Sequence, residues 1–119
     1  MSLEKLLRQI KQHPQTVEFD DVMAVIGQHY IYTETGFSNG VGEDRVVNAA
    51  GSNAGSCRIF AFGRLNGLSQ AETLACFGRY YRDDVVGNPE GQDHGNIRTF
   101  MRHGWAGIRF DGEPLRSRP

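Results

Sequence analysis

The residues best suited to chemistry lie where a run of small and amide side chains meets a cysteine. The chain from Asn48 to Ser56 contains only Asn, Ala, Gly and Ser, and Cys57 with a dense apolar stretch follows at once. If that stretch is a helix, the free backbone N–H groups of its first turn point toward the residues beside Cys57. Such a junction can bind an anion or lower the pKa of a thiol.

One interpretation of this junction is nucleophilic catalysis. Residues 55–57 (Gly-Ser-Cys) look locally like the nucleophile segment of papain-type cysteine hydrolases. In such enzymes a histidine and the helix N-terminus favour the thiolate, and backbone N–H groups hold the oxyanion. Here His94 would be the base, and Asp93 or Asn96 would orient it. The competing interpretation is that Cys57 packs in the core, because free cysteine is among the most buried residue types.

A second interpretation is an anion site. His94, Arg98 and Arg102 fall within about 80° of one another on a predicted helix, given its period of about 3.6 residues, and they form one cationic face. This face could lie beside the small-residue loop, although the arginines could equally pair with nearby acids. The loop has neither the Gly-Lys-Ser/Thr of a P-loop nor a dinucleotide fingerprint. The predicted binding residues are Asn53, Gly55, Ser56, Arg98 and Arg102.

Metal binding is not indicated by the histidines or cysteines. His94 and His103 would lie on opposite faces of an ideal helix, so they cannot share a site as a helical pair. Cys57 and Cys76 are far apart and have no C-x-x-C spacing. The acids between residues 83 and 93 lack the alternation of an EF-hand loop. We therefore expect no metal and no other cofactor.

Composition narrows the partners and the compartment. A net charge of −1 argues against general affinity for nucleic acid. No apolar run approaches the roughly 20 residues of a membrane span, and residues 1–14 lack the features of a secretory signal. We expect reduced thiols, no membrane association and a location in the cytoplasm. The sequence does not indicate an oligomeric state.

The N-terminal half predicts two helices and a hairpin. Leucine and isoleucine repeat at helical spacing over residues 2–13, and Pro14 ends that pattern. Thr16 is the predicted cap of a second helix, whose apolar stripe runs from Phe19 to Tyr30. Asn39 and Gly40 form a turn signal between segments rich in β-branched and aromatic residues, which indicates a small hairpin.

The C-terminal half predicts three more helices. Residues 57–65 fit either a helix or a buried strand, and we favour a helix because Asn66 and Gly67 end the run. Ser69 and Glu72 form a capping box, which opens a helix predicted to extend to Tyr81. Asp93 is the predicted cap of a last helix that buries Ile97, Phe100 and Met101 and ends before Gly104. A closing strand or clamp follows from Trp105 to Phe110, and residues 111–119 are predicted to be a frayed tail.

These elements define one α+β domain over residues 1–119, predominantly helical, with about five helices and a small antiparallel sheet. At this length the chain should bury roughly two-thirds of its unfolded surface, which is enough for a single core. The predicted core is Leu7, Ile10, Phe19, Val22, Ile26, Phe60, Phe62, Leu74, Phe77, Ile97, Phe100 and Trp105.

Four segments together resemble the HopJ type III effector family of small bacterial proteins. They are residues 53–62 (NAGSCRIFAF), 74–83 (LACFGRYYRD), 93–101 (DHGNIRTFM) and 104–110 (GWAGIRF), with Tyr32-Thr33 and Gly36-Phe37 extending the likeness upstream. The resemblance implies delivery into a host cell by a type III secretion system. It implies no reaction and no catalytic residues.

We therefore expect a non-catalytic binding or interaction domain that recognises an anionic group. The partner would be a host-cell protein or an anionic small molecule. The alternative is a small cysteine-dependent hydrolase that acts on an amide or ester through Cys57, His94 and Asp93.

Overall fold

The computed structural model describes all residues from 1 to 119 and confirms the α+β class. The helical elements are α1 (Leu3–Gln12), the turn η1 (Pro14–Thr16), α2 (Phe19–His29), the turn η2 (Gly42–Asp44), α3 (Ala54–Leu65), α4 (Gln70–Ala75), the π-helical turn η3 (Tyr80–Val85), α5 (Gly95–His103) and the turn η4 (Gly104–Gly107). The strands are β1 (Tyr30–Tyr32), β2 (Phe37–Asn39), β3 (Val46–Asn48), β4 (Arg109–Phe110) and β5 (Leu115–Ser117).

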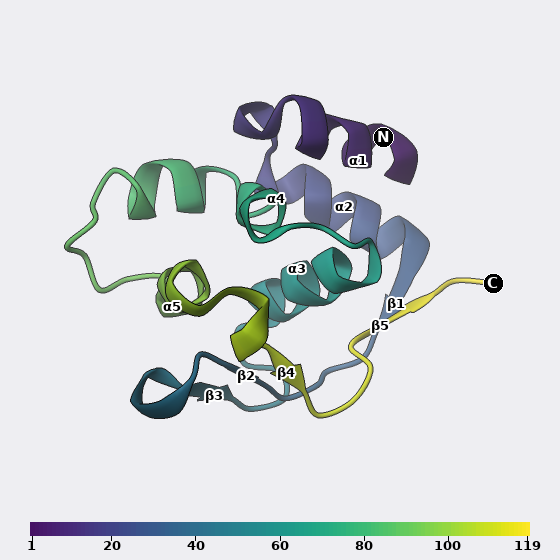
Figure 1. The fold of residues 1–119 in the computed structure, drawn as a ribbon. Coiled ribbons are helices and arrows are strands. Elements are labelled where there is room, and N and C mark those ends of the chain that lie inside the picture. Colours follow the sequence, from purple (N-terminus) through teal and green to yellow (C-terminus); the bar gives the residue numbers. More distant parts are fainter.

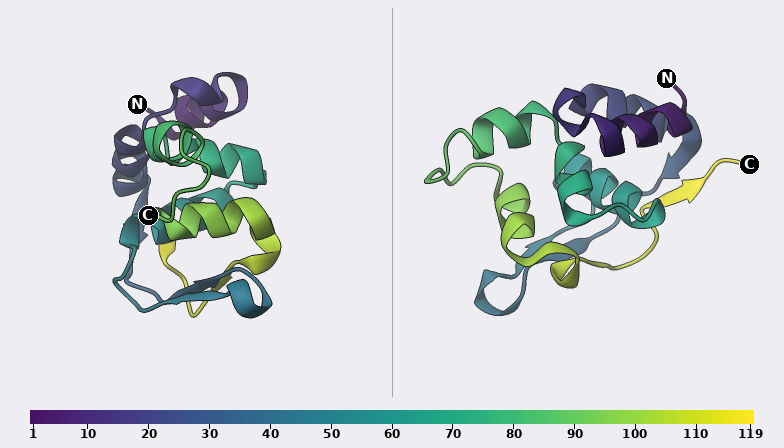
Figure 2. Two further views of the ribbon diagram at one scale, coloured as in Figure 1. Left: turned by 90° about the vertical axis from the view of Figure 1, so that its left-hand side faces the viewer. Right: turned by 45° about the horizontal axis from the view of Figure 1, so that its top comes forward.

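The helix α3 runs through the middle of the molecule, with α1 and α2 on one side of it and the β3-β2-β4 sheet on the other, while the β1-β5 pair lies at the end near the C-terminus (Figure 1). The same layers are visible when the molecule is turned (Figure 2). Six of the seven residues from Cys57 to Gly63 are buried, so this helix is apolar on almost every side. A helix surrounded by protein loses the one-sided stripe of a surface helix. That explains why its sequence also fitted a buried strand.

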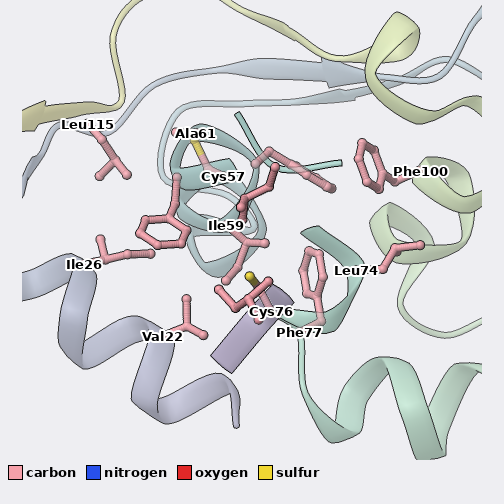
Figure 3. Packing of buried hydrophobic residues seen from close by; sticks show 14 of the residues in the cluster. Val22, Ile26, Cys57, Ile59, Ala61, Leu74, Cys76, Phe77, Phe100 and Leu115 are labelled. Atoms are coloured by element: carbon pink, nitrogen blue, oxygen red, sulfur yellow. The ribbon is translucent and has the colours of Figure 1, made fainter. Parts of the chain in front are cut away.

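The core is one cluster of 22 buried residues in which four phenylalanine rings meet. The Phe60 ring from α3 lies 4.8 Å from that of Phe100, 5.6 Å from that of Phe77 and 5.9 Å from that of Phe37, measured between centroids. These separations and tilts are those at which aromatic rings attract one another. Figure 3 shows the cluster around α3, with the sulfur atoms of Cys57 and Cys76 inside it.

The predicted core residues all belong to this cluster or pack against it. Leu7, Phe19 and Trp105 are only partly buried, and they pack against the cluster from outside. Met101 does not belong to the buried face of its helix, because 39% of its surface is exposed.

The predicted hairpin is present, although its connection is longer than a two-residue turn. Strands β2 and β3 pair antiparallel with Phe37 opposite Asn48, and residues 40–45, including η2, join them. Gly40 has a φ of +97°, and an added Cβ would lie 2.7 Å from the Asp44 carbonyl oxygen. Strand β4 pairs with the other edge of β2, which gives the order β3-β2-β4.

The C-terminal segment corrects the prediction of a frayed tail over residues 111–119. Strand β5 pairs antiparallel with β1, with Leu115 opposite Tyr32. The Leu115 side chain is buried in the core, and the Arg118 backbone N–H donates to the His29 carbonyl at 3.0 Å. The segment is ordered because β1 has no other strand beside it and because Leu115 gains burial there.

Two predicted helix caps are wrong. The cap position of α2 is Glu18, and the Thr16 hydroxyl instead donates to the His13 carbonyl at 2.7 Å. The cap position of α5 is His94 in a left-handed conformation, and the Asp93 carboxylate is taken up by Arg98. A side chain that could cap a helix can instead bond another group nearby in the chain, and Thr16 and Asp93 both do so.

The helix predicted to extend to Tyr81 ends at Ala75. Gly78 has a φ of +61°, which a helix cannot accommodate, and an added Cβ there would lie 2.7 Å from the Phe19 nitrogen. The chain turns at this point and continues as η3, a π-helical turn of the kind often found at functional sites. This turn brings Tyr80 toward the start of α2, where its ring packs edge-on against Phe19.

The capping box of α4 is confirmed and should matter for stability. The Ser69 hydroxyl accepts the Glu72 N–H, and the Glu72 carboxylate accepts the Ser69 N–H at 2.8 Å. We expect Ser69→Ala to lower the free energy of unfolding by about 1 kcal/mol in urea titrations followed by circular dichroism. Ser117→Ala, which removes an exposed hydroxyl without a hydrogen bond, is the control and should cost less than about 0.5 kcal/mol. Equal losses in both variants would contradict a specific role for the box.

The same box predicts an acid dependence. The hydrogen bond from the Ser69 N–H, helped by Lys11, lowers the pKa of Glu72 below its ordinary value of 4.5. The stabilisation from this carboxylate is therefore complete above pH 4.5 and is lost as the pH falls through the lower pKa of the folded state. We expect Glu72→Gln to lose less stability than the unchanged protein between neutral and acid pH. If the urea midpoints of both proteins fall by the same amount as the pH is lowered, Glu72 contributes nothing to the acid response.

Candidate functional site

A pocket of about 570 Å³ lies where the starts of α3 and α5 meet. The α3 side is formed by Asn53, Gly55 and Ser56, and the α5 side by the segment from His94 to Ile97. Two of the four stretches that carry the family resemblance, residues 53–62 and 93–101, therefore face the same cavity. The rest of its lining comes from Phe19, Val46, Asn48, Phe77 and Tyr80.

Both helices enter the pocket through a residue in the left-handed conformation. Asn53 has a φ of 51° and His94 a φ of 53°, and they are the two positive-φ residues of the chain that are not glycine. Each occupies the N-cap position, and neither side chain caps its own helix. A non-glycine residue held in this conformation is strained, and such strain is often found at functional sites.

The first backbone N–H groups of both helices have no protein acceptor. The first hydrogen bond of α3 runs from the Cys57 N–H to the Asn53 carbonyl, and that of α5 from the Arg98 N–H to the His94 carbonyl. The donors of residues 54–56 and 95–97 are therefore unpaired. Two helix N-termini together concentrate a partial positive charge at the pocket.

An asparagine network fixes the two helix starts relative to each other. The Asn48 side-chain oxygen accepts one hydrogen bond from the Asn53 amide at 2.7 Å and another from the Asn96 amide at 3.0 Å. Behind them, the Asn39 amide donates to the Asn96 carbonyl at 2.9 Å. Asn39, Asn48 and Asn96 are buried, so these bonds form away from competing water. The network holds the pocket in a defined shape.

Aromatic rings form one wall of the pocket. Tyr80 packs edge-on against Phe19 with centroids 5.2 Å apart, and its ring lies 5.3 Å from the imidazole of His94. Gly55 lets this wall approach α3, because an added Cβ would lie 3.1 Å from the Phe19 ring. The pocket therefore combines a wall of polar donors with a wall of apolar surface.

His94 is held by acids behind the pocket. Its Nε2 lies 3.0 Å from an Asp84 carboxylate oxygen and 3.9 Å from Asp93. An ionised carboxylate only accepts hydrogen bonds, so Nε2 carries the hydrogen in this pair. The carboxylates fix the orientation of the ring.

The predicted arginines do not line the pocket. Arg98 instead secures the loop before α5, donating from Nε to the Asp93 carbonyl at 2.6 Å and from Nη1 to the Asn88 carbonyl at 3.0 Å. Its ion pair with Asp93 holds the pKa of that carboxyl below its usual range. Arg102 reaches the other way, to Asp44, at 3.4 Å. Arg98 thus positions His94 through the backbone and is not itself a pocket residue.

The Cys57 thiol is buried away from His94. Its side chain is 1% exposed and does not line the pocket, and its Sγ lies 3.6 Å from the Thr35 carbonyl oxygen. Burial raises the pKa of Cys57 to about 11, despite the nearby positive charge of Arg58. At neutral pH the group is a thiol, which is neither a nucleophile nor a strong metal ligand.

Sequence reasoning identified the α3 side of this pocket and missed the aromatic wall. The sequence pattern assigns Phe19 to an apolar helix stripe and predicts a helix that extends past Tyr80 to Tyr81, whereas the turn at Gly78 brings Tyr80 to the pocket. The left-handed conformations at Asn53 and His94 had a weak signal, since asparagine and histidine tolerate that region better than most residues.

No group of three or more histidine, cysteine, aspartate or glutamate side chains is arranged to hold a metal ion. No helix is long and apolar enough to cross a membrane.

The burial of Cys57 predicts slow alkylation. We expect iodoacetamide at neutral pH to label neither Cys57 nor Cys76 in the folded protein, because burial raises the pKa of Cys57 to about 11 and that of Cys76 to about 12. Both should react within minutes in denaturant, as followed by mass spectrometry. Cys57→Ser separates the two sites. Rapid labelling of Cys57 in the folded protein that is lost in His94→Ala would contradict the packing role and support a nucleophile.

Comparison with known proteins places the chain in a family. The solved structure named "Crystal structure of unknown function protein VPA0580" is similar over 99% of this chain and 95% of its own, with 47% sequence identity and a TM-score of 0.94. A comparison with curated proteins gave no match. The family described as HopJ type III effector protein matches residues 3–115, which include both sides of the pocket. The chain therefore belongs to the HopJ type III effector protein family.

Proposed function

We propose that this protein is a non-catalytic binding domain whose pocket between α3 and α5 recognises an anionic group. The observation that carries the proposal is the convergence of two helix N-termini with unpaired N–H groups on one cavity. Backbone N–H groups and the helix dipole both favour a negative charge at such a place. The asparagine network holds the donors in position before a ligand arrives, which lowers the entropic cost of binding.

The lining suggests how such an anion would be held. No lysine, arginine, aspartate or glutamate lines the pocket, so neutral donors provide most of the contacts, and His94 and Tyr80 are the only ionisable side chains there. Phe19 and Tyr80 would cover an apolar part of the same ligand. An anion attached to a larger organic group fits this combination better than a free inorganic ion does.

The family suggests the setting of this binding activity. We propose that the protein is a type III effector and that the anionic group belongs to a host-cell protein or a small molecule. The family description supports the first part, and the pocket supports the second. Secretion itself is tested by detecting the protein in the medium of a bacterium with a functional secretion needle, and in that of a needle-deficient mutant as control.

The alternative of a cysteine hydrolase finds less support. A hydrolase needs a thiolate that is open to solvent and within hydrogen-bond reach of a base. Cys57 is buried, and its raised pKa keeps it protonated at neutral pH. The His94 Nε2 is already engaged by Asp84. The geometry therefore favours binding over catalysis.

Phenyl phosphate is a suitable probe because it joins an anion to an aromatic ring. At ten times its dissociation constant it should stabilise the protein by about 1.4 kcal/mol, which corresponds to a rise in melting temperature of about 6 °C. Ser56→Glu should abolish this response, because an internal carboxylate in the first turn of α3 would occupy the N–H groups. The same substitution should raise the melting temperature without ligand, since a negative charge there is favourable by about 0.5 kcal/mol.

Gln28→Glu is the matched control, because it adds the same charge at an exposed position near the other end of α2. It should leave the response to phenyl phosphate unchanged. If Ser56→Glu and Gln28→Glu respond alike, or if the unchanged protein shows no stabilisation by phenyl phosphate at all, the pocket is not an anion site.

A further inference from the structure

We propose that a second cavity, between α2, β1 and α3, binds a short-chain carboxylate. The cavity measures about 240 Å³ and is separate from the pocket described above, with which it shares no residue. Its charged groups are Arg58 and Arg118, and it contains no acid. The inference does not depend on the proposed function, because neither helix N-terminus takes part in it.

Arg58 is the residue that points to a ligand. Arg58 is half-buried, and its guanidinium carbon lies 4.2 Å from the centre of the Tyr32 ring, while the guanidinium group makes no hydrogen bond or ion pair with any protein acceptor. Other sheltered arginines of the chain are engaged, since Arg64 donates to the Ile108 carbonyl and Arg98 to the Asp93 carboxylate. A guanidinium fork matches the two oxygens of a carboxylate, and in Arg58 that fork is free.

The Tyr32 hydroxyl is a second unsatisfied donor at this place. Its oxygen is buried and has no hydrogen-bond partner. Burial raises the pKa of Tyr32 above its ordinary value, so the group keeps its hydrogen and can donate it. A buried hydroxyl without a partner is costly, and few occur in native proteins without a reason. An anion that accepts from Tyr32 and Arg58 together would satisfy both.

The rest of the cavity is lined by residues of α2 and β1 and by Arg118 of the C-terminal segment. Met23, Ile26 and Tyr30 provide the hydrophobic surface of the cavity. The Arg118 side chain donates twice to the Gly27 carbonyl, at 3.2 and 3.0 Å, which keeps its positive charge at the cavity edge. The cavity thus presents two cations, one neutral donor and an apolar wall.

Size and lining together select the ligand class. Pockets for drug-sized molecules begin at about 300 Å³, so this smaller cavity suits a ligand of only a few heavy atoms. An inorganic phosphate would satisfy the cations but could not use the apolar wall. A carboxylic acid with a short alkyl chain uses both, with its carboxylate at Arg58 and its chain against Met23 and Ile26.

Butyrate is the probe for this inference. Titrated into ¹⁵N-labelled protein, it should cause saturable shifts in the amide signals of residues 23–32 and 58. Butyramide has the same shape without the charge and should bind at least about tenfold more weakly, because hydrogen bonds between charged partners are the stronger ones. Acetate should also bind more weakly than butyrate, because it lacks most of the alkyl chain.

Variants locate the site. Arg58→Gln should weaken butyrate binding at least about tenfold, and Tyr32→Phe at least about threefold. Arg8→Gln, at an exposed position of α1, is the matched control and should stay within about twofold of the unchanged protein. If Arg58→Gln does not fold, Arg58→Lys keeps the charge without the fork and should still weaken binding measurably.

Three results would overturn the inference: no saturable shift with butyrate, equal affinity for butyramide, or Arg58 variants that bind as Arg8→Gln does. Phenyl phosphate in the same experiment should shift signals at the starts of α3 and α5. Failure of that probe would count against the proposed function alone, and failure of butyrate against the second cavity alone.

Discussion

The burial of α3 on nearly all sides is the constraint on which the rest of the structure depends. A helix surrounded by protein must satisfy its polar ends at the few places where it meets the surface. The C-terminal end of α3 does so locally, with the Asn66 side chain donating to the Phe62 carbonyl at 2.9 Å. The N-terminal end does not, since its first N–H groups find no acceptor in the chain. The packing that stabilises α3 therefore leaves the polar start of this helix at the edge of the hydrophobic cluster, where it lines the pocket.

The second helix start at the same opening follows from the sheet. Strand β2 lies beside α5 and places Asn39 against Asn96, while its partner β3 ends at Asn48 beside the start of α3. The Asn48 amide oxygen, which joins both helices, is thus fixed by backbone pairing within the sheet. Without that pairing, the Asn48 side chain would not hold the two helix starts in a fixed position relative to each other. The small sheet thus adds Phe37 to the core and, through Asn39 and Asn48, holds the pocket in shape.

The sequence was sufficient wherever local chemistry decides the structure. The stripe of α1, the Ser69 box and the stop at Asn66-Gly67 were read correctly, because each depends on residues within a few positions of one another. Errors arose where a distant partner decides. Leu115 is ordered by β1, and the positive φ of Gly78 fits the close approach of α2. The α3 side of the pocket was predictable from its small residues, whereas the aromatic wall depended on that turn at Gly78.

The first two turns of α3 show why one short segment can serve several purposes. Consecutive residues of a helix point about 100° apart, so Ser56, Cys57 and Arg58 face three different directions. Ser56 lines the large pocket, Cys57 enters the core and Arg58 lines the small cavity. The residue that first suggested catalysis is therefore the one that faces neither cavity. A reactive thiol at this position would require the core packing around Cys57 to open.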